Sequence, residues 1–214
     1  GDPILQSDFV GALLSACRDR GIDTAIETAG FGQWDQLEKI GRYANLIFYD
    51  VKSMDTEKHK AFTGVSNVRI LENLSRLSIR FPEIPIVART SVIPGFNDTN
   101  KDISAIVKFL RTIKTLTKYE LLPYHKFGTP KYRHLGKTYL YPDTSPPTQE
   151  CMQRLRVIVD DHLTINKKKI AILGKLMKNK MIIQPTVRVL SNDQKSRIHS
   201  DALKILSSVG IRVE

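Results

Sequence analysis

Polar residues with binding chemistry stand where three strand-like apolar runs of the sequence end. They are Glu27, Thr28, Asp50, Lys52 and His125. The carboxyl ends of parallel strands meet at one rim of a barrel or sheet, and binding sites lie at that rim. We therefore expect these side chains to share one polar site.

Arg89 differs because it lies inside an apolar run, residues 86–93. An unpaired charge there would be costly, so we expect it to have a buried partner. The other residues each have a structural alternative. Asp50 could cap the next helix, Lys52 could be a solvated charge, and His125 could be a structural histidine.

Helical and strand-like patterns alternate along the first part of the chain. Helical spacing covers residues 9–20, 34–43, 70–81, 102–116 and 148–163, and strand-like runs cover residues 24–28, 46–49, 86–93 and 119–123. This alternation favours a parallel sheet with right-handed crossovers, either a barrel or an open doubly wound sheet. Residues 128–147, rich in Pro, Gly and Tyr, are expected to form a loop over the rim.

The composition is that of a soluble globular protein, with 41% hydrophobic and 26% charged residues among 214. No apolar run approaches the roughly 18 residues of a membrane span, so we expect a cytoplasmic location and no membrane association. The net charge of +11 is concentrated in residues 165–214, which hold 11 Lys and Arg against 3 acids. Because aromatic residues do not interleave with these basic residues, nucleic acid is not an expected partner.

The chain has two cysteines, which limits the metal sites that it can form. Cys17 and Cys151 lie far apart and match no metal-ligand spacing. A thiolate-held iron–sulfur cluster needs about three or four cysteines, so this chain alone is not expected to hold one. Each cysteine falls in a helical pattern and is expected to be a small buried apolar residue.

Six segments, in order along the chain, resemble motifs of the pyruvate formate-lyase activating enzyme family. They are residues 1–6, 27–31 (Glu-Thr-Ala-Gly-Phe), 50–52, 63–74, 89–98 and 120–128, the last containing Leu-Pro-Tyr-His. The resemblance implies an oxidoreductase with a radical S-adenosylmethionine (SAM) (β/α) barrel and a four-iron four-sulfur (4Fe-4S) cluster. Reductive cleavage of SAM would yield a 5'-deoxyadenosyl radical, which takes a hydrogen atom from a glycine of a glycyl radical enzyme. The implied partners are that enzyme and an electron donor such as flavodoxin or ferredoxin, in an anaerobic cytoplasm.

The resemblance also implies roles for individual residues. The implied SAM-binding residues are Gly1, Asp2, Pro3, Thr28, Asp50, Lys52, Arg89 and His125, and the implied ligands of a monovalent cation are Glu27, Thr28 and Asp50. The turn at residues 1–3 would meet the amino group of SAM. Lys52, Arg89 and His125 would donate to its carboxylate and ribose, since an arginine can grip a carboxylate with two hydrogen bonds.

The sequence departs from the family pattern at its start. The family carries its cluster on a Cys-x-x-x-Cys-x-x-Cys loop before a Gly-Gly-Glu-Pro turn. This sequence begins inside that turn, with Asp2 in place of the glutamate. We therefore expect residues 1–164 to form an incomplete radical SAM barrel that lacks its first strands and is inactive alone. The alternative is a non-catalytic fragment that docks a partner or binds SAM.

The tail carries a second resemblance. Residues 165–180 are expected to be a basic linker, and residues 181–214 resemble the start of trimethylamine methyltransferase family proteins, which are corrinoid-dependent barrels. The chain could therefore be a fusion fragment of such a methyltransferase, or the tail could be an ordinary basic helical extension. In either case, we expect no catalytic residue in the tail.

Overall fold

The computed structural model of the chain describes residues 1–139, 143–163 and 200. The chain separates into two compact units, Gly1–Ala171 and Ile172–Glu214, and the fold reported below is that of the first. The predicted linker over residues 165–180 lies outside the described residues, as does the predicted methyltransferase-like tail apart from residue 200.

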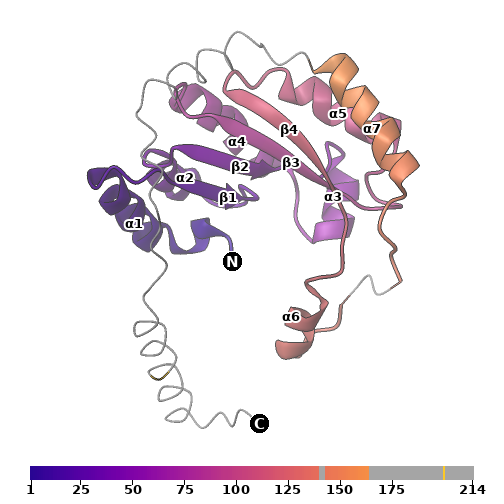
Figure 1. The fold of residues 1–214 in the computed structure, drawn as a ribbon, viewed down its shortest axis with the longest axis horizontal. Helices are drawn as coiled ribbons and strands as arrows, with labels where there is room; N and C mark the ends of the chain where they lie inside the picture. Colours follow the sequence, from indigo (N-terminus) through magenta and orange to yellow (C-terminus); the bar gives the residue numbers. More distant parts are fainter. Residues whose placement is uncertain (140–142, 164–199, 201–214) are drawn as a thin grey trace. The chain divides into compact units, whose positions relative to one another are not determined.

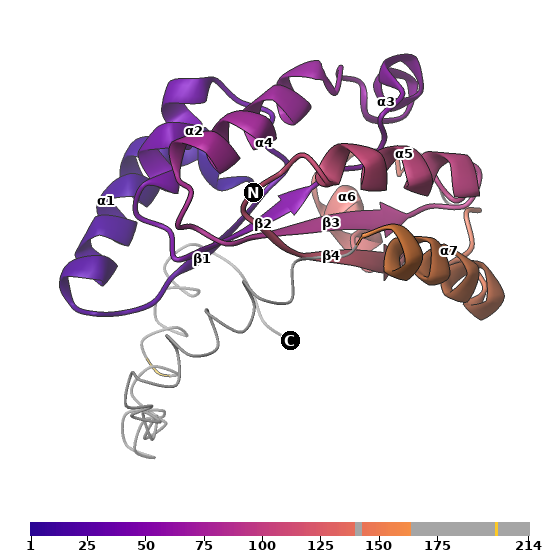
Figure 2. The same ribbon diagram turned by 90° about the horizontal axis from the view of Figure 1, so that it is seen from above.

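Four parallel strands form the centre of this unit, in the order β1-β2-β3-β4 (Figure 1). They are β1 (Ala25–Thr28), β2 (Leu46–Asp50), β3 (Ile86–Val92) and β4 (Leu116–Pro123). Each strand pairs with the next one along the chain, and the helices between them lie on one side of the sheet (Figure 2). The predicted parallel α/β arrangement is therefore confirmed.

The helices of the described residues follow the strands in regular succession. They are η1 (Pro3–Gln6, a 3-10 helix), α1 (Ser7–Asp19), α2 (Trp34–Gly41), α3 (Thr56–Thr63), α4 (Val68–Arg80), α5 (Asn100–Leu110), α6 (Thr129–His134) and α7 (Gln149–His162). Helices α1, α2, α4 and α5 cover one face of the sheet, and α7 packs against α5 and β4 (Figure 2). None of the described helices is long and apolar enough to cross a bilayer.

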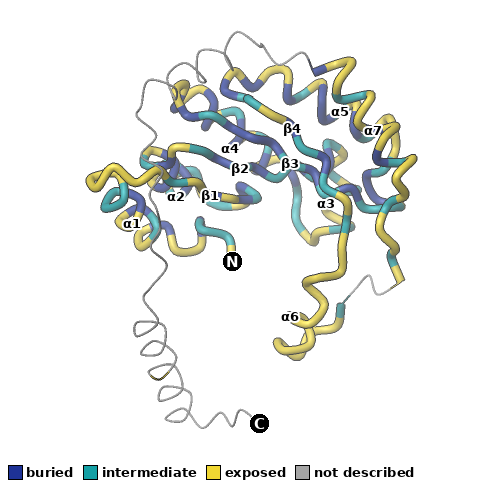
Figure 3. Tube along the Cα trace, viewed as in Figure 1, coloured by how far each residue is buried: buried dark blue, intermediate teal, exposed yellow. Residues whose placement is uncertain are grey.

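Strand residues alternate between a buried face and an open face of the sheet. On the face beneath the helices, Ile47, Tyr49 and Ala88 are at most 1% exposed. The core continues into the helices through residues such as Leu37 and Ile40 of α2. Along β2, and along β3 from Ala88 onward, buried and half-buried positions alternate (Figure 3). In these segments the half-buried positions belong to the open face.

A glycine is required where the chain leaves β1. Gly30 has φ +69°, and a Cβ at this position would lie 1.7 Å from the Tyr49 hydroxyl oxygen. That hydroxyl donates a 2.7 Å hydrogen bond to the carbonyl of Ile70 in the first turn of α4. The amide of Asn73 donates to the carbonyls of Gly30 and Gly32. Together these contacts fix the loop after β1 against α4.

One predicted boundary is wrong. The helical spacing continues to residue 116, but α5 ends at Leu110 and Leu116 already begins β4. Ile113 keeps the helical spacing because it is a core residue, 5% exposed, in the connection. The carbonyl of Thr115 accepts a 2.9 Å hydrogen bond from the backbone of Ile86 in β3. Pairing with a neighbouring strand therefore overrides the local pattern.

Two short helices have no counterpart in the sequence prediction. Helix α3 begins after Asp55, whose side chain accepts a hydrogen bond from the Lys58 backbone, and ends at Gly64 with φ +83°. Helix α6 lies inside the segment that was expected to be a loop, residues 128–147. Helix α3 buries only His59, and the described side chains of α6 are exposed, so neither helix has an apolar stripe that would stand out in the sequence.

Candidate functional site

The open face of the sheet gathers charged residues from all four strands. The ladder pairs Glu27 with Phe48, Asp50 with Arg89, and Arg89 with Glu120. Paired residues of parallel strands point to the same face, so these five side chains share the face that the helices leave uncovered (Figure 2). Four of the five carry a charge.

Arg89 lies at the centre of this group. Its Nε donates a 3.0 Å hydrogen bond to Oε2 of Glu120, and its Nη1 lies 3.2 Å from Oε1 of Glu27. The guanidinium also stacks on Phe48, with Cζ 3.6 Å from the ring centroid. Because the Arg89 side chain is only 20% exposed, acidic neighbours rather than water balance most of its charge. The apolar surroundings of Arg89 predicted a buried partner, and the structure supplies one in Glu120, although its side chain is half-buried rather than buried, 22% exposed.

Glu120 is held by a second cation from its own strand. Lys118 Nζ lies 2.7 Å from Oε1 of Glu120, so each carboxylate oxygen has a different basic partner. The hydrogen bond from Lys118, reinforced by the one from Arg89, holds the pKa of Glu120 below its usual range even though burial acts in the opposite direction. Neither Lys118 nor Glu120 was predicted as a site residue from the sequence. The signal was the alternation of Lys118 and Glu120 with buried Tyr119 and Leu121.

Asp50 and Lys52 form a second charged pair at the end of β2. Lys52 Nζ lies 3.1 Å from Oδ2 of Asp50, and each side chain is 31% exposed. The alternative role of Asp50 as the cap of the next helix is excluded, because Asp55 caps α3. Lys52 is likewise a paired rather than a freely solvated charge.

Asn97 fixes the chain segment that carries Lys52. Its amide nitrogen donates to the carbonyls of Lys52 at 2.8 Å and Ser91 at 3.0 Å. Its amide oxygen accepts a 2.8 Å hydrogen bond from the backbone of Ile93. The side chain is fully buried and so ties the segment after β2 to the end of β3. Sequence reasoning did not single out this residue.

Asp2 anchors the N-terminal turn to the end of β1. Its carboxylate accepts hydrogen bonds from the Thr28 hydroxyl and the Ala29 backbone, both at 2.8 Å, and from the Ile4 backbone at 3.1 Å. Thr28 is 2% exposed and points to the helix-covered face. The structure therefore does not bring its hydroxyl to Asp50 on the open face, and a cation shared by the two stays a prediction.

The remaining predicted residues are less tightly held. Gly1 is exposed, and Pro3 begins η1. His125 follows β4, is exposed, and stacks on Phe127 with ring centroids 4.3 Å apart. Within the described residues, no hydrogen bond or ion pair joins His125 to Arg89. Its role in the site stays a prediction.

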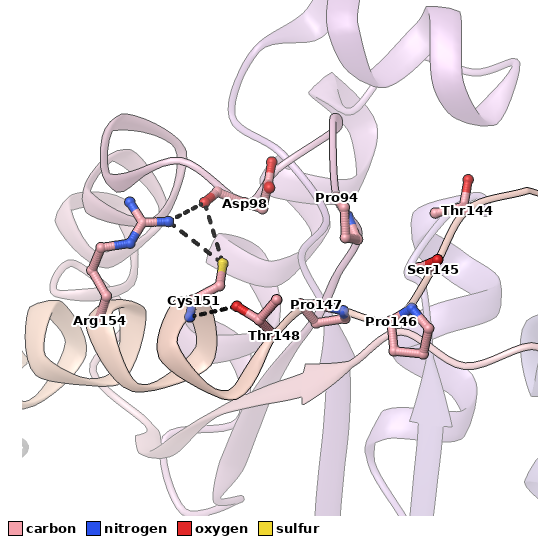
Figure 4. Close-up of a pocket in the computed structure, with 9 residues that line it drawn as sticks. All are labelled: Pro94, Asp98, Thr144, Ser145, Pro146, Pro147, Thr148, Cys151 and Arg154. Carbon is pink, nitrogen blue, oxygen red and sulfur yellow. Dashed lines mark hydrogen bonds between the residues drawn. The ribbon is translucent and has the colours of Figure 1, made fainter.

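A separate cavity of about 420 Å³ lies between the loop after β3 and the segment that leads into α7 (Figure 4). At one end Arg154 donates a 3.1 Å hydrogen bond to the Asp98 carbonyl and a 3.5 Å hydrogen bond to Sγ of Cys151. Pro94 and Pro146 are among its lining residues. None of the predicted site residues lines this cavity, so it is distinct from the open face.

The sequence is similar to curated activating enzymes of glycyl radical enzymes. It is 49% identical over 137 residues to the isethionate sulfite-lyase activating enzyme of Oleidesulfovibrio alaskensis, covering 64% of this chain and 44% of that protein. It is 39% identical over 162 residues to the 4-hydroxyphenylacetate decarboxylase activating enzyme of Clostridioides difficile strain CD196, covering 76% of this chain and 51% of that protein. The chain is a homologue of glycyl radical enzyme activating enzymes.

The structure of this activating-enzyme homologue agrees with its sequence relatives. It matches the crystal structure of a domain of pyruvate-formate lyase-activating enzyme from Bacteroides vulgatus with a TM-score of 0.62 and 27% identity, covering 76% of this chain and 90% of that one. The predicted fold class, an α/β domain of the radical SAM type, is thereby confirmed. The homologue spans about half the length of the curated relatives it matches. No protein-family model matches it.

This family implies two cofactors, SAM and a 4Fe-4S cluster, and the residues of this chain suit only SAM. The open face offers cationic and carboxylate groups side by side, which suits the amino-acid part of SAM, itself a carboxylate next to an ammonium. The cluster does not fit. The 214 residues contain two cysteines, Cys17 in α1 and Cys151 in α7, and a thiolate-held cluster needs about three or four.

The two cysteines are also less buried than predicted. Both are free thiols that are half-buried, and Cys151 packs against the edge of the core. Among the described residues, no three His, Cys, Asp or Glu side chains come together as a metal site.

Proposed function

We propose that the open face of the sheet binds SAM, and that the chain contributes this site to an activating enzyme that acts on a glycyl radical enzyme. The observation that carries the proposal is the charged group centred on Arg89, which lies level with the carboxyl ends of β1 and β2 and midway along the longer strands β3 and β4. Ligands of parallel α/β sheets bind beyond the carboxyl ends of the strands. The similarity to named activating enzymes supports the same assignment.

The chemistry of the ligand matches the chemistry of the face. The methionine part of SAM presents a carboxylate and an ammonium group, and its sulfonium adds a second positive charge. Arg89 and Lys52 are the cations that would hold the carboxylate, and Asp50 is a carboxylate placed to accept from the ammonium. When bound and reduced, SAM supplies the radical of this enzyme family, and these residues hold and orient it.

The cysteine count limits what these residues do. Two cysteines on separate helices do not supply the ligands of a 4Fe-4S cluster. We therefore propose that residues 1–163 supply SAM binding and docking to the partner enzyme, and we assign no redox step to them. A flavodoxin or ferredoxin as electron donor and a cytoplasmic location accompany this proposal.

Isothermal titration calorimetry with SAM tests the proposal directly. The wild-type chain is expected to bind SAM, and Arg89→Gln is expected to weaken the affinity about 10-fold or more, because a charge-assisted hydrogen bond to a carboxylate is lost. Arg76→Gln is the matched control, since Arg76 also stacks on an aromatic ring, that of Trp34, but on the helical layer. Equal affinity of wild type and Arg89→Gln, or no heat of binding at all, would contradict the proposal.

Anaerobic incubation with SAM and dithionite separates binding from catalysis. The expected result is that SAM binds and that no 5'-deoxyadenosine forms after reconstitution with iron and sulfide, because residues 1–214 hold too few thiolates for a cluster. Release of 5'-deoxyadenosine at a rate above that of a Cys17→Ser, Cys151→Ser double variant would show that these residues do hold a redox centre.

A further inference from the structure

We propose that Glu120 is a positioning residue that fixes the guanidinium of Arg89 in the orientation needed to receive the carboxylate of SAM. This inference rests on the proposed function of the open face. It assigns a role to β4, which contributes none of the predicted ligand contacts itself.

First, Glu120 is itself immobilised. Its Oε1 lies 2.7 Å from Lys118 Nζ, and its Oε2 accepts from Arg89 Nε at 3.0 Å. Rotation of the carboxylate would break both interactions at once. The side chain is 22% exposed, so water could replace them only in part. Lys118 and Glu120 lie two residues apart on one strand, which places both on the open face.

Second, the contact with Glu120 and the contact with Phe48 together define the plane of the guanidinium. The ring of Phe48 lies 3.6 Å from Cζ and prevents tilting, whereas the hydrogen bond at Nε prevents rotation within the plane. A planar guanidinium held at its inner nitrogen presents its two outer nitrogens in one direction. That arrangement is the one a bidentate carboxylate requires.

Third, the two acidic neighbours of Arg89 are not equivalent. Glu27 lies on strand β1, its side chain is 59% exposed, and its contact to Nη1 is 3.2 Å. Glu120 is anchored by Lys118, is mostly shielded from water, and contacts Nε. Within the described residues, Arg89 uses Nε and Nη1, which leaves Nη2 for a ligand. An incoming carboxylate can therefore displace Glu27, while Glu120 stays in place.

The experiment compares two ligands by calorimetry. SAM carries the amino-acid carboxylate and ammonium on a sulfonium, whereas 5'-methylthioadenosine keeps the adenosine and a neutral thioether but lacks the whole amino-acid part. Glu120→Ala is expected to weaken SAM binding about 5- to 10-fold and to leave 5'-methylthioadenosine binding unchanged. Glu120→Gln, whose amide oxygen still accepts from Nε, is expected to recover part of the SAM affinity.

Two further variants make the test specific. In an Arg89→Ala background, adding Glu120→Ala is expected to have no further effect on SAM, since a positioning residue acts only through the group it positions. Glu38→Gln is the matched control, because Glu38 pairs with the Nε of Arg80 at 2.6 Å, is 24% exposed, and lies away from the sheet face. It is expected to bind SAM as the wild type does.

The outcomes distinguish the inference from the function on which it rests. If the wild type does not bind SAM, or Arg89→Ala binds it equally well, both are overturned. If Arg89→Ala loses affinity but Glu120→Ala does not, the inference alone fails. Equal weakening of both ligands by Glu120→Ala, or additive effects in the double variant, would also overturn it, because either result indicates a general structural role.

Discussion

The position of Arg89 explains its unusual set of neighbours. Arg89 is paired with Asp50 in the ladder, whereas Glu27 lies two strands away and is paired with Phe48. To reach Glu27, the Arg89 side chain must cross β2 over Phe48. The stacking is therefore a consequence of the strand order, and an aromatic side chain at position 48 suits a guanidinium that passes above it.

Gly30 gives the sharpest residue-level prediction. Gly30→Ala is expected to lower the free energy of unfolding by about 3 kcal/mol, because the new Cβ overlaps the Tyr49 hydroxyl and the left-handed φ is strained. Gly21→Ala is the control. Gly21 has a similar φ of +67° but open space around it, so the cost there is expected to be about 1 kcal/mol. Urea unfolding of both variants checks the difference, and equal losses would show that overlap with Tyr49 is unimportant.

At the scale of elements, the strands show which features a single sequence can predict. All four strands and five of the helices follow from apolar spacing, because each buries one full face or stripe. The boundary between α5 and β4 does not follow, since Ile113 and Leu116 satisfy a helical pattern while the backbone there pairs with β3. Local spacing contains no information about such non-local pairing.

The same distinction applies to the site. Asp50, Lys52 and Arg89 were found because charged residues stand out at the ends of strands or inside apolar runs. Glu120 and Asn97 were missed. Their importance lies in partners that are 31 and 45 residues away in the sequence, and only the folded sheet brings these together.

Asn97 links two strand ends, and its loss is expected to affect both. Asn97→Ala removes three hydrogen bonds of a fully buried side chain and should lower the free energy of unfolding by about 2–4 kcal/mol. Asn97→Asp should cost at least as much, since a carboxylate would face the carbonyls of Lys52 and Ser91. Urea denaturation at neutral pH measures both, and a loss below about 1 kcal/mol for either variant would contradict this role.

The contact between α3 and α5 predicts a pH dependence. Burial acts to raise the pKa of Asp102, but hydrogen bonds from Lys58 and Thr99 outweigh it and hold that pKa below its usual value. A carboxyl whose pKa is lower in the folded state stabilises the protein above its unfolded-state pKa. That contribution is lost as the pH falls through the folded-state pKa.

Asp102→Asn is therefore expected to be less stable than the wild type by about 1 kcal/mol at pH 7. The difference should shrink as the pH falls below the unfolded-state pKa of an aspartate, about 4, and toward the lower folded-state pKa of Asp102. Chemical denaturation at a series of pH values measures the difference. A gap that stays constant down to pH 3 would indicate that the ion pair with Lys58 does not contribute.

At the scale of the molecule, the excess positive charge and the sheet with its open face lie in different parts of the chain. Residues 165–214 hold 11 of the 33 Lys and Arg residues but 3 of the 22 acids. The four strands, the core and every open-face residue lie within the first compact unit, Gly1–Ala171. The excess positive charge therefore belongs to a part of the chain that supplies none of the groups proposed to bind SAM.

A chain that ends at Ala171 is accordingly expected to keep the affinity for SAM within about twofold and to unfold at the same urea concentration as the full chain. Calorimetry and urea unfolding of the two chains provide the comparison. A loss of SAM affinity on removal of residues 172–214 would show that the second unit takes part in the site.

The two faces of the sheet also constrain how these strands can change in length. In β2, Tyr49 contributes to the core and Asp50 to the open face, so adjacent residues lie on opposite faces of the sheet. Inserting one residue within the strand would exchange the two, placing a carboxylate under the helices and an aromatic ring among the charges. Inserting two residues would return each side chain to its original face of the sheet. Insertions within a strand therefore preserve the two faces only when they add an even number of residues. The connecting loops have no such restriction and tolerate insertions of any length.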